Sequence, residues 1–285
     1  MIELLRKVIR ITIFFCIIFV LNVCSSDKNN VTDPNDTVPS IPGWKLVWND
    51  EFDGSTIDQN KWGYEVNGDG GGNNEIQYYT ARDTNSFIND GKLVIVARPE
   101  IYKVGDNTWY FTSARLRTLN KGDWKYGRIE VSAKVPTGVG TWPAIWMLSS
   151  DWEYGGWPES GEIDIMEHVG YDPNVIHGSI HTLAYNHRIG TQITAQLKIP
   201  TATTEFHKYA IEWFEDHIDF FIDDFKYLTF TNENKGWQYW PFDKRFHLIL
   251  NLAVGGSWGG AQGVDFDAFP AQMEVDFVRV YEKAD

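Results

Sequence analysis

From Lys45 onward the chain is a succession of short apolar runs, each ended by Gly, Asn, Asp or Pro. The runs are rich in Val, Ile, Phe and Tyr, and no segment has a long helical period. Clear examples are GKLVIVAR, YGRIEVSAKVP, TWPAIWML, GEIDIMEHV, VIHGSIHT, YAIEWFEDHIDFFIDDFKYLTF, FHLILNLAV and MEVDFVRVYEK. Evenly spaced short strands with turn residues between them predict an all-β antiparallel sandwich or barrel. There is no internal repeat, and 285 residues suffice for one large β domain.

Residues 1–43 differ in composition and are expected to lie outside this domain. A basic stretch over residues 6–10 precedes an apolar run over residues 11–23. Because a membrane span needs ~20 apolar residues, the shorter run is typical of a signal peptide. The sequence LNVC at 21–24 resembles a loose bacterial lipobox, in which Cys24 becomes the lipidated first residue. Ordinary cleavage and an uncleaved anchor stay open as alternatives.

The predicted organisation is a signal peptide over 1–24, a polar tether over 25–43 and one folded domain over 44–285. Cys16 and Cys24 are the only cysteines, so the domain has no disulfide and depends on its core or on a bound ion. We expect an exported monomer, held at the bacterial outer membrane or cell surface by lipid alone, or else secreted or periplasmic.

The charge and the aromatic residues indicate the kind of partner. A formal net charge of -14 argues against nucleic acid and disfavours a heavily sulfated substrate. Among the 13 Trp, some are expected to cover a sugar-sized groove. On a two-residue period Trp142, Ala144, Trp146 and Leu148 share one strand face, which makes an aromatic platform or, equally, a part of the core.

The stretch GEIDIMEHVG, residues 161–170, contains three acids among apolar residues. Glu162 and Asp164 share a strand face, but Glu167 falls on the other. A β-bulge at Ile165-Met166 adds one residue and returns Glu167 to the face of the first two. The outer Glu Cα atoms are then roughly 13 Å apart, a gap that long side chains on a concave sheet can close.

Such a ladder of acids suits glycoside hydrolysis. A retaining glycosidase needs two carboxyls ~5–5.5 Å apart, one an ionised nucleophile and one a proton donor. Neighbouring, partly buried carboxylates raise one another's pKa and titrate as a coupled set, which supplies both forms.

The ladder has two other interpretations. A metal site with His168, His177 and His181 is one, although no HExxH-like spacing is present. A solvated acidic edge is the other, but it does not explain why acids alternate with Ile163 and Ile165.

The stretch GEIDIMEHVG resembles the signature of glycoside hydrolase family sixteen, in the bulged form of bacterial laminarinases, which are endo-β-1,3-glucanases. Further blocks follow in the family's order over roughly residues 44–282, including WKLVWNDEFDG, GNNEIQYYT, TSARLRT, KYGRIEVSAKVP, GTWPAIWML, FHKYAIEW, LILNLAVGGSWGG and MEVDFVRVY. The resemblance implies a concanavalin-like β-jelly roll of two sheets with a substrate cleft on the concave face.

The resemblance also implies roles for residues. Glu162 is the implied nucleophile, Asp164 its helper and Glu167 the general acid/base, with no cofactor for catalysis. Residues matching positions that contact sugar or shape its subsites are Asn74, Arg115, Trp142, Trp146, His177, His181, Asn251 and Trp258. A structural calcium of many relatives would match Glu51, Gly91 and Asp276, with backbone carbonyls among its ligands.

The implied activity is retaining endo-hydrolysis of β-1,3-glucosidic linkages in laminarin-type glucans, with mixed-linkage β-1,3-1,4-glucan as a second substrate. The alternatives are a relative acting on agar or carrageenan and a non-catalytic carbohydrate-binding protein. The segment HTLAYNHRIGTQITAQLKIPTAT after β-strand residues VIHGSI departs from the family's usual short Gly-rich segment, which leaves the acceptor side of the cleft undefined.

Overall fold

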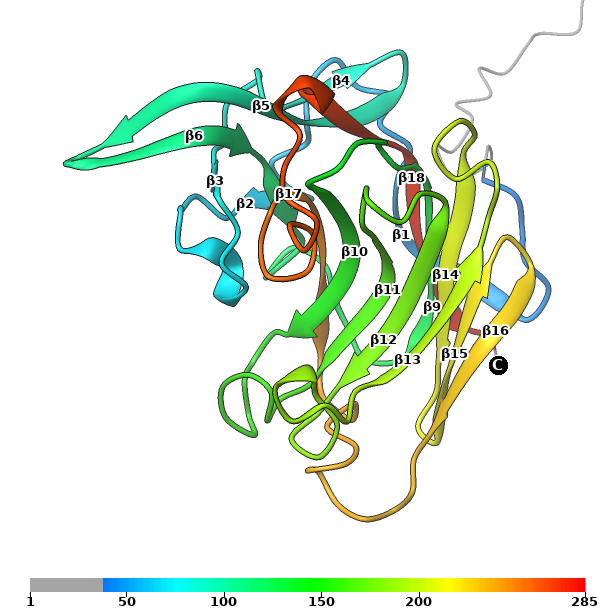
Figure 1. Ribbon diagram of the computed structural model, residues 1–285. Helices are drawn as coiled ribbons and strands as arrows, with labels where there is room; N and C mark the ends of the chain where they lie inside the picture. Colours follow the sequence, from blue (N-terminus) through cyan, green and yellow to red (C-terminus); the bar gives the residue numbers. More distant parts are fainter. Residues whose placement is uncertain (1–37, 285) are drawn as a thin grey trace, which may run out of the picture. The chain divides into compact units, whose positions relative to one another are not determined.

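The computed structural model describes residues 38–284, and from Ser40 onward they form one compact unit (Figure 1). The predicted signal peptide, Cys24 and most of the tether lie outside the described residues. No helix within residues 38–284 is long and apolar enough to cross a membrane. The described helical elements are the 3-10 turns η2 (Gly70–Gly72), η3 (His187–Ile189) and η4 (Phe266–Ala268).

The first sheet has ten strands. They are β1 (Trp44–Asp50), β3 (Gln77–Tyr79), β4 (Ser86–Asn89), β5 (Lys92–Val104), β6 (Asn107–Ser113), β9 (Gly127–Lys134), β14 (His207–Trp213), β15 (His217–Ile222), β16 (Phe225–Thr231) and β18 (Ala271–Lys283). Their order is β16-β15-β14-β9-β18-β5-β6-β3, with β1 paired to β18 and β4 to β5. The pairing is antiparallel except between β3 and β6.

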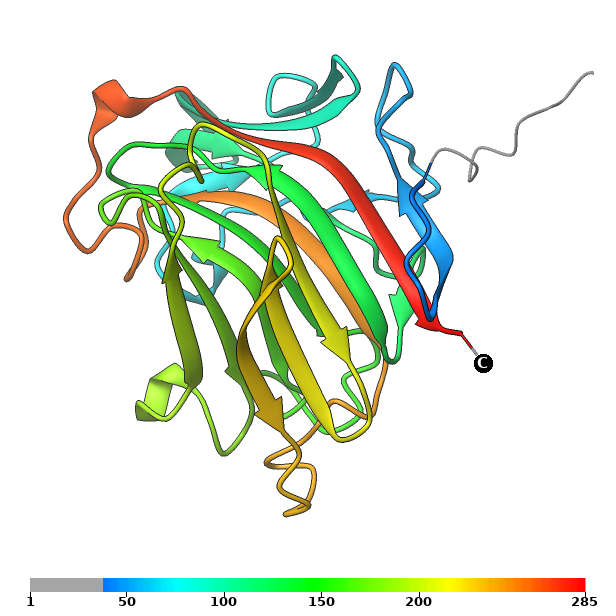
Figure 2. The same cartoon turned by 90° about the vertical axis from the view of Figure 1, so that its right-hand side faces the viewer.

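The second sheet has eight strands. They are β2 (Gly63–Tyr64), β7 (Arg115–Arg117), β8 (Asp123–Trp124), β10 (Thr141–Ser149), β11 (Glu162–His168), β12 (Val175–His181), β13 (Ile193–Lys198) and β17 (Phe246–Val254). Their order is β13-β12-β11-β10-β17-β7-β2, with β8 paired to β17. Figure 2 shows the two sheets curving together, one behind the other.

The core lies between the sheets and follows the two-residue period of the strands. On β10, Ile145 and Met147 are fully buried in it, while Trp146 and Leu148 point the other way and line a cleft. From the first sheet, Ile211 and Phe220 meet the same core. The predicted two-sheet β-jelly roll is therefore confirmed, and the long run YAIEWFEDHIDFFIDDFKYLTF forms the three strands β14, β15 and β16.

Candidate active site

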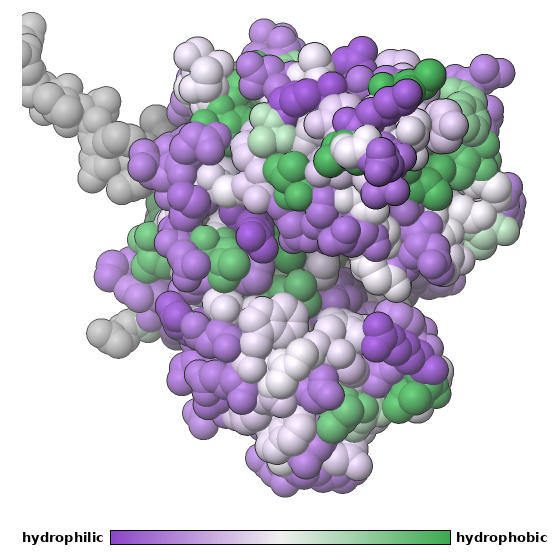
Figure 3. Space-filling view, turned by 90° about the vertical axis from the view of Figure 1, so that its left-hand side faces the viewer, coloured by the Kyte–Doolittle hydropathy of each residue, from purple (hydrophilic) through white to green (hydrophobic). Residues whose placement is uncertain are grey.

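A cleft of about 480 Å³ lies on the outer face of the second sheet, and the molecular face in Figure 3 is hollowed there. Strands β7, β10, β11 and β17 form its floor. The segment 65–75 lines one part of its wall, and two tryptophans with the pair His187-Arg188 line another. Its lining includes Glu65, Glu75, Arg115, Arg117, Trp142, Ala144, Trp146, Leu148, Trp152, Trp157, Glu162, Asp164, Glu167, His187, Arg188 and Asn251.

The side chains of three acids on β11 all point into this cleft because the strand contains a β-bulge. Trp146 of β10 pairs with Asp164, and the residue before it, Ile145, pairs with Met166. Ile165 is therefore the extra residue, and the pairing of β11 with β12 is interrupted at the same place. Both Ile165 and Met166 are fully buried in the core, which drives the bulge. The bulge predicted at this dipeptide is confirmed.

Each of the outer glutamates accepts a hydrogen bond from a tryptophan. Trp157 Nε1 donates to Glu162 Oε2 at 2.8 Å, and Trp142 Nε1 donates to Glu167 Oε1 at 3.1 Å. An indole N–H is a donor only, so both bonds favour the ionised carboxylate. The two bonds also fix the side-chain orientation of both acids.

The middle acid lies against His181. Its Oδ2 is 3.2 Å from Nε2 of His181, in a geometry that does not make a hydrogen bond, and Glu162 Oε1 is 3.8 Å from the same nitrogen. The side chain of Asp164 is only 3% exposed. Among residues 38–284 these three form the one group of His, Cys, Asp or Glu side chains close enough to share a metal ion.

The other two histidines of the predicted metal alternative do not join this group. His168 points to the opposite side of β11, is fully buried, and its Nε2 accepts a bond from the Asn174 backbone N–H at 3.3 Å. His177 packs edge-on against Trp258, with ring centres 4.9 Å apart. The geometry therefore favours acid–base chemistry by carboxyls over a metal site built on the three histidines.

Burial makes ionisation of the three acids costly. It raises the pKa of Glu162 to about 8, with Asp164 as the next cause, and the pKa of Glu167 to about 7, with Glu162 as the next cause. Burial and then Glu167 raise the pKa of Asp164 well above its usual range. His181 and the two indole donors act in the opposite direction. Burial and mutual repulsion therefore oppose simultaneous ionisation of the three carboxyls, and a proton gained or lost by one changes the pKa of the others.

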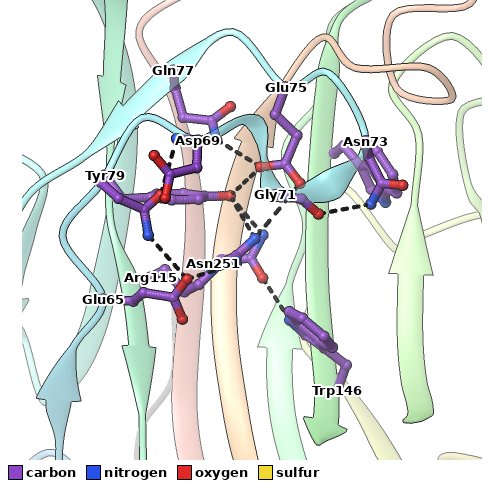
Figure 4. A network of polar contacts seen from close by, with 12 residues as sticks. Glu65, Asp69, Gly71, Asn73, Glu75, Gln77, Tyr79, Arg115, Trp146 and Asn251 are labelled. Atoms are coloured by element: carbon purple, nitrogen blue, oxygen red, sulfur yellow. Dashed lines mark hydrogen bonds and ion pairs between the residues drawn. The ribbon is translucent and has the colours of Figure 1, made fainter. Parts of the chain in front are cut away.

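Arg115 is buried within a network of polar contacts (Figure 4) and lines the same cleft as the three acids. Its guanidinium pairs with Glu65 at 3.2 Å and with Glu75 at 3.6 Å. Its central carbon lies 4.6 Å from the ring centre of Tyr79 and 5.3 Å from that of Trp146. Burial acts to lower the pKa of Arg115, but the facing Tyr79, Glu75 and Glu65 raise it overall. The arginine is thus a fixed, partly neutralised cation under the cleft.

The same network orients Trp146. Its Nε1 donates to Asn251 Oδ1 at 2.6 Å, and Asn251 Nδ2 donates to the Tyr79 hydroxyl at 3.1 Å. The Tyr79 hydroxyl donates to Glu75 Oε2 at 2.9 Å, which also accepts from Gln77 Nε2 at 2.7 Å. Figure 4 shows this chain of contacts leading from the segment before β3 to the tryptophan. The indole is held at a set angle in the cleft floor.

The predicted sugar-contacting residues divide into two groups. Arg115, Trp142, Trp146 and Asn251 line the cleft itself. The other four lie next to it. His181 contacts two of the acids, and Trp258 packs edge-on against Trp142 with ring centres 5.5 Å apart. His177 packs against Trp258, and Asn74 Nδ2 donates to Ser257 Oγ at 2.9 Å. The two strand-face tryptophans predicted as platform or core therefore face the cleft.

Several lining residues were not identified from the sequence. Trp157 lies five residues before Glu162, and this closeness to the acid motif could have indicated a place in the site. No sequence pattern near Glu65 or Glu75 indicates their role, because their partner Arg115 is 40 or more residues away along the chain. His187 and Arg188 belong to the segment whose departure from the family pattern left one side of the cleft undefined.

The predicted calcium positions lie near one another in the first sheet. Asp50, the last residue of β1, pairs with Val278 on β18, and Leu93, near the start of β5, pairs with Val275. Glu51 and Gly91, just beyond these paired residues, therefore lie near Asp276 in the middle of β18. The Glu51 carboxylate is already held by Arg279, at 2.7 and 3.0 Å. Its side chain is therefore a poor fit for a calcium ligand, and an ion there would depend on backbone carbonyls and Asp276. The calcium site stays a prediction.

The chain is similar to known proteins over nearly its whole length. The model of "Glycosyl hydrolases family 16" matches residues 71–279. A β-glucanase of Rhodothermus marinus is 51% identical over 97% of this chain and 96% of its own.

Solved structures of glucanases also resemble this chain. The laminarinase from Rhodothermus marinus superposes with a TM-score of 0.83 at 52% identity, covering 86% of this chain and all of the other. A mutant of a non-specific endo-β-1,3(4)-glucanase from family GH16, co-crystallised with 1,3-β-D-cellotriosyl-glucose and presenting a 1,3-β-D-cellobiosyl-glucose at its active site, gives a TM-score of 0.82 at 46% identity. The match covers 85% of this chain and 96% of the other.

The raised pKa values predict a pH-dependent stability. A carboxyl whose folded pKa lies above its ordinary 4.5 binds its proton more tightly when folded, so stability is full below about pH 4.5 and is lost as the pH rises through 7 to 8. Glu162→Gln should therefore leave the unfolding free energy nearly unchanged at pH 5 and raise it by roughly 2 kcal/mol at pH 8. Urea denaturation at both pH values measures this.

Glu100→Gln is the matched control. The hydrogen bond from Arg82 lowers the pKa of Glu100, so its contribution is present above the ordinary pKa of 4.5. This variant should lose stability at both pH values. An equal gain of Glu162→Gln at pH 5 and pH 8 would contradict the burial argument.

Proposed function

Because this chain belongs to glycoside hydrolase family 16, we propose that it hydrolyses β-1,3-glucosidic linkages within laminarin-type glucans and retains the anomeric configuration. The observation that carries this function is the acid ladder of Glu162, Asp164 and Glu167 on one face of a bulged strand in a cleft. Mixed-linkage β-1,3-1,4-glucan is the proposed second substrate. A neutral glucan also suits a cleft whose floor cation Arg115 is already paired with Glu65 and Glu75.

In the proposed first step, Glu162 attacks the anomeric carbon and forms a glycosyl-enzyme. Glu167 gives its proton to the departing glycosidic oxygen, so that the shortened chain leaves as an alcohol. In the second step Glu167 takes a proton from water, the water oxygen attacks the same carbon, and Glu162 leaves as a carboxylate. Two inversions give net retention.

The contacts of each acid support these roles. Glu162 receives the Trp157 hydrogen bond at 2.8 Å and lies 3.8 Å from His181, and both stabilise its anion. Asp164 is nearly buried between the two glutamates, and burial raises its pKa, which favours the protonated form that can donate to a neighbouring carboxylate. Burial raises the pKa of Glu167 to about 7, a value suited to both giving and taking a proton near neutral pH.

The cleft floor has the chemistry of a sugar site. Pyranose rings present C–H faces that pack on flat indole rings, while their hydroxyls need fixed polar partners. Trp146 and Trp142 supply the flat surfaces, and both are oriented by their own hydrogen bonds. Glucose units are proposed to bind over β10, β17 and β7, where Trp142, Trp146 and Asn251 line the cleft.

Product analysis tests the function. We expect oligosaccharides from the interior of laminarin, weaker release from lichenan, and proton NMR of the first products showing the β-anomer before mutarotation. Agarose and carrageenan serve as controls that should stay intact. Cleavage of a galactan in preference to laminarin would favour a galactanase, and binding without any cleavage would favour a carbohydrate-binding protein.

Two alanine variants distinguish the roles of the glutamates. Glu167→Ala should lose 10²–10⁴-fold on laminarin, an order of magnitude typical of a proton donor, but keep first-step activity on an aryl β-glucoside oligomer with an acidic phenol. Azide should accelerate that variant and give a β-glycosyl azide. Glu162→Ala has no nucleophile, so any azide product should be the α-anomer. If the two variants exchanged these behaviours, the assignment would be reversed.

We also propose that Cys24, outside the described residues, carries a lipid anchor. The supporting observation is an apolar run that ends at Cys24 before a polar tether. Since one acyl chain binds a membrane only marginally, the several chains of a bacterial lipoprotein are needed. Cys24→Ser should move the protein from membrane to soluble fractions or block its maturation. Unchanged fractionation, together with a wild type that carries no acyl group by mass spectrometry, would refute the anchor.

A further inference from the structure

The loop between β12 and β13 brings a cation to the nucleophile end of the cleft. Its residues His187 and Arg188 line the cleft together with Trp157 and Glu162. The guanidinium carbon of Arg188 lies 4.5 Å from the ring centre of Trp157, and the His187 ring centre is 4.9 Å from it. The same indole donates its N–H to Glu162. Arg188, on an exposed loop, therefore contacts the tryptophan that hydrogen-bonds to the proposed nucleophile.

The loop is built to hold Arg188 in place. Asn186, 3% exposed, accepts a bond from the Arg188 backbone N–H at 3.1 Å and donates to the Thr182 and Leu183 carbonyls at 3.1 and 3.2 Å. The Ala184 backbone N–H donates to the Gln238 carbonyl at 2.9 Å and ties the loop to a distant segment. These bonds fix the backbone on which the guanidinium is carried.

The charge of Arg188 has no acidic partner within ion-pair distance among residues 38–284. The other two arginines of the cleft lining differ, because Arg115 and Arg117 both lie within 3.6 Å of Glu65. The face of an indole is the most favourable aromatic surface for a cation. The contact with Trp157 is therefore the specific interaction that the Arg188 side chain makes in this structure.

We propose that Arg188 is a positioning residue that acts on Glu162 through Trp157. By holding one face of the indole, it fixes the ring angle at which Nε1 points to Glu162 Oε2. An indole without this contact spends less time in the donating orientation, so Glu162 accepts the Trp157 hydrogen bond for a smaller part of the time. The inference rests on the role proposed for Glu162. Around that carboxylate the other ionisable groups are Asp164, Glu167 and His181. His187, beside Arg188 on the loop, also faces the indole, with its ring centre 4.9 Å from that of Trp157 and 5.2 Å from that of His181.

A double-mutant cycle tests the inference. Arg188→Ala should lower kcat on laminarin about 3- to 10-fold with little change in KM, since the contact is of the partly exposed kind. Because loss of the indole donor raises the pKa of Glu162, the acidic limb of the kcat/KM profile should move to higher pH. Arg188→Lys should restore most of the activity. In the Trp157→Phe background, which has no indole N–H, Arg188→Ala should have no further effect.

The control is Lys283→Ala, which removes a cation 4.9 Å from the Trp44 ring centre, in the first sheet and outside the cleft. It should leave kcat and the pH profile unchanged. A full effect of Arg188→Ala in the Trp157→Phe background would show that Arg188 contacts the substrate directly and would overturn the inference. So would wild-type kinetics for Arg188→Ala.

A second measurement is independent of activity. In ¹⁵N-labelled protein the indole N–H signal of Trp157, identified by its absence in Trp157→Phe, should exchange with water faster in Arg188→Ala than in the wild type. Unchanged exchange would refute the positioning role. Failure of the proposed function would instead appear as an inactive wild type on every glucan, with this exchange difference still measurable.

Discussion

The bulge at Ile165-Met166 is the constraint on which the active site depends. A strand of strict two-residue period would send either Glu167 into the core or the apolar side chains after Asp164 into the cleft. The bulge avoids both costs, because Ile165 and Met166 enter the core while the third acid rejoins the first two. The neighbouring strands must follow this shift, and the pairing with β12 is interrupted at the same residues. Core packing and catalytic geometry therefore have one common cause.

Once the acids share a face, their mutual repulsion has to be moderated without neutralising them. A buried ion pair with Arg115 would make a carboxylate permanently ionised, and here that arginine is committed to Glu65 and Glu75 instead. The outer glutamates receive neutral donors, the indoles of Trp157 and Trp142. A neutral donor lowers a carboxyl pKa less than a full charge does. The carboxyls can consequently still exchange protons near neutral pH.

The sequence predicted what depends on local pattern. The strands, the all-β class, the position of the bulge and the shared strand face of Trp142 and Trp146 follow from periodicity within single segments. The two-sheet jelly roll and the activity follow from the family resemblance, and only the structure decides that the two tryptophans face the cleft. What it could not predict depends on contacts between distant segments. The bond from Asn251 to Tyr79 joins residues 172 positions apart, and no pattern near either residue indicates it. The loop carrying Arg188 departed from the family pattern, so its place at the cleft became known only from the structure.

The two walls of the cleft differ in how they are held. On the side of β7, buried charges and hydrogen bonds connect Glu75, Tyr79 and Asn251 to the floor, so a change at any one leaves a buried polar group without its partner. On the side of Trp157, the wall is an exposed loop whose own backbone bonds hold it, and His187 and Arg188 present side chains to the cleft from it. Exposed loops tolerate substitution far better than buried networks do. Sequence changes that tune the nucleophile or the bound sugar at low cost in stability should therefore accumulate on the loop side, while the buried network keeps the floor fixed.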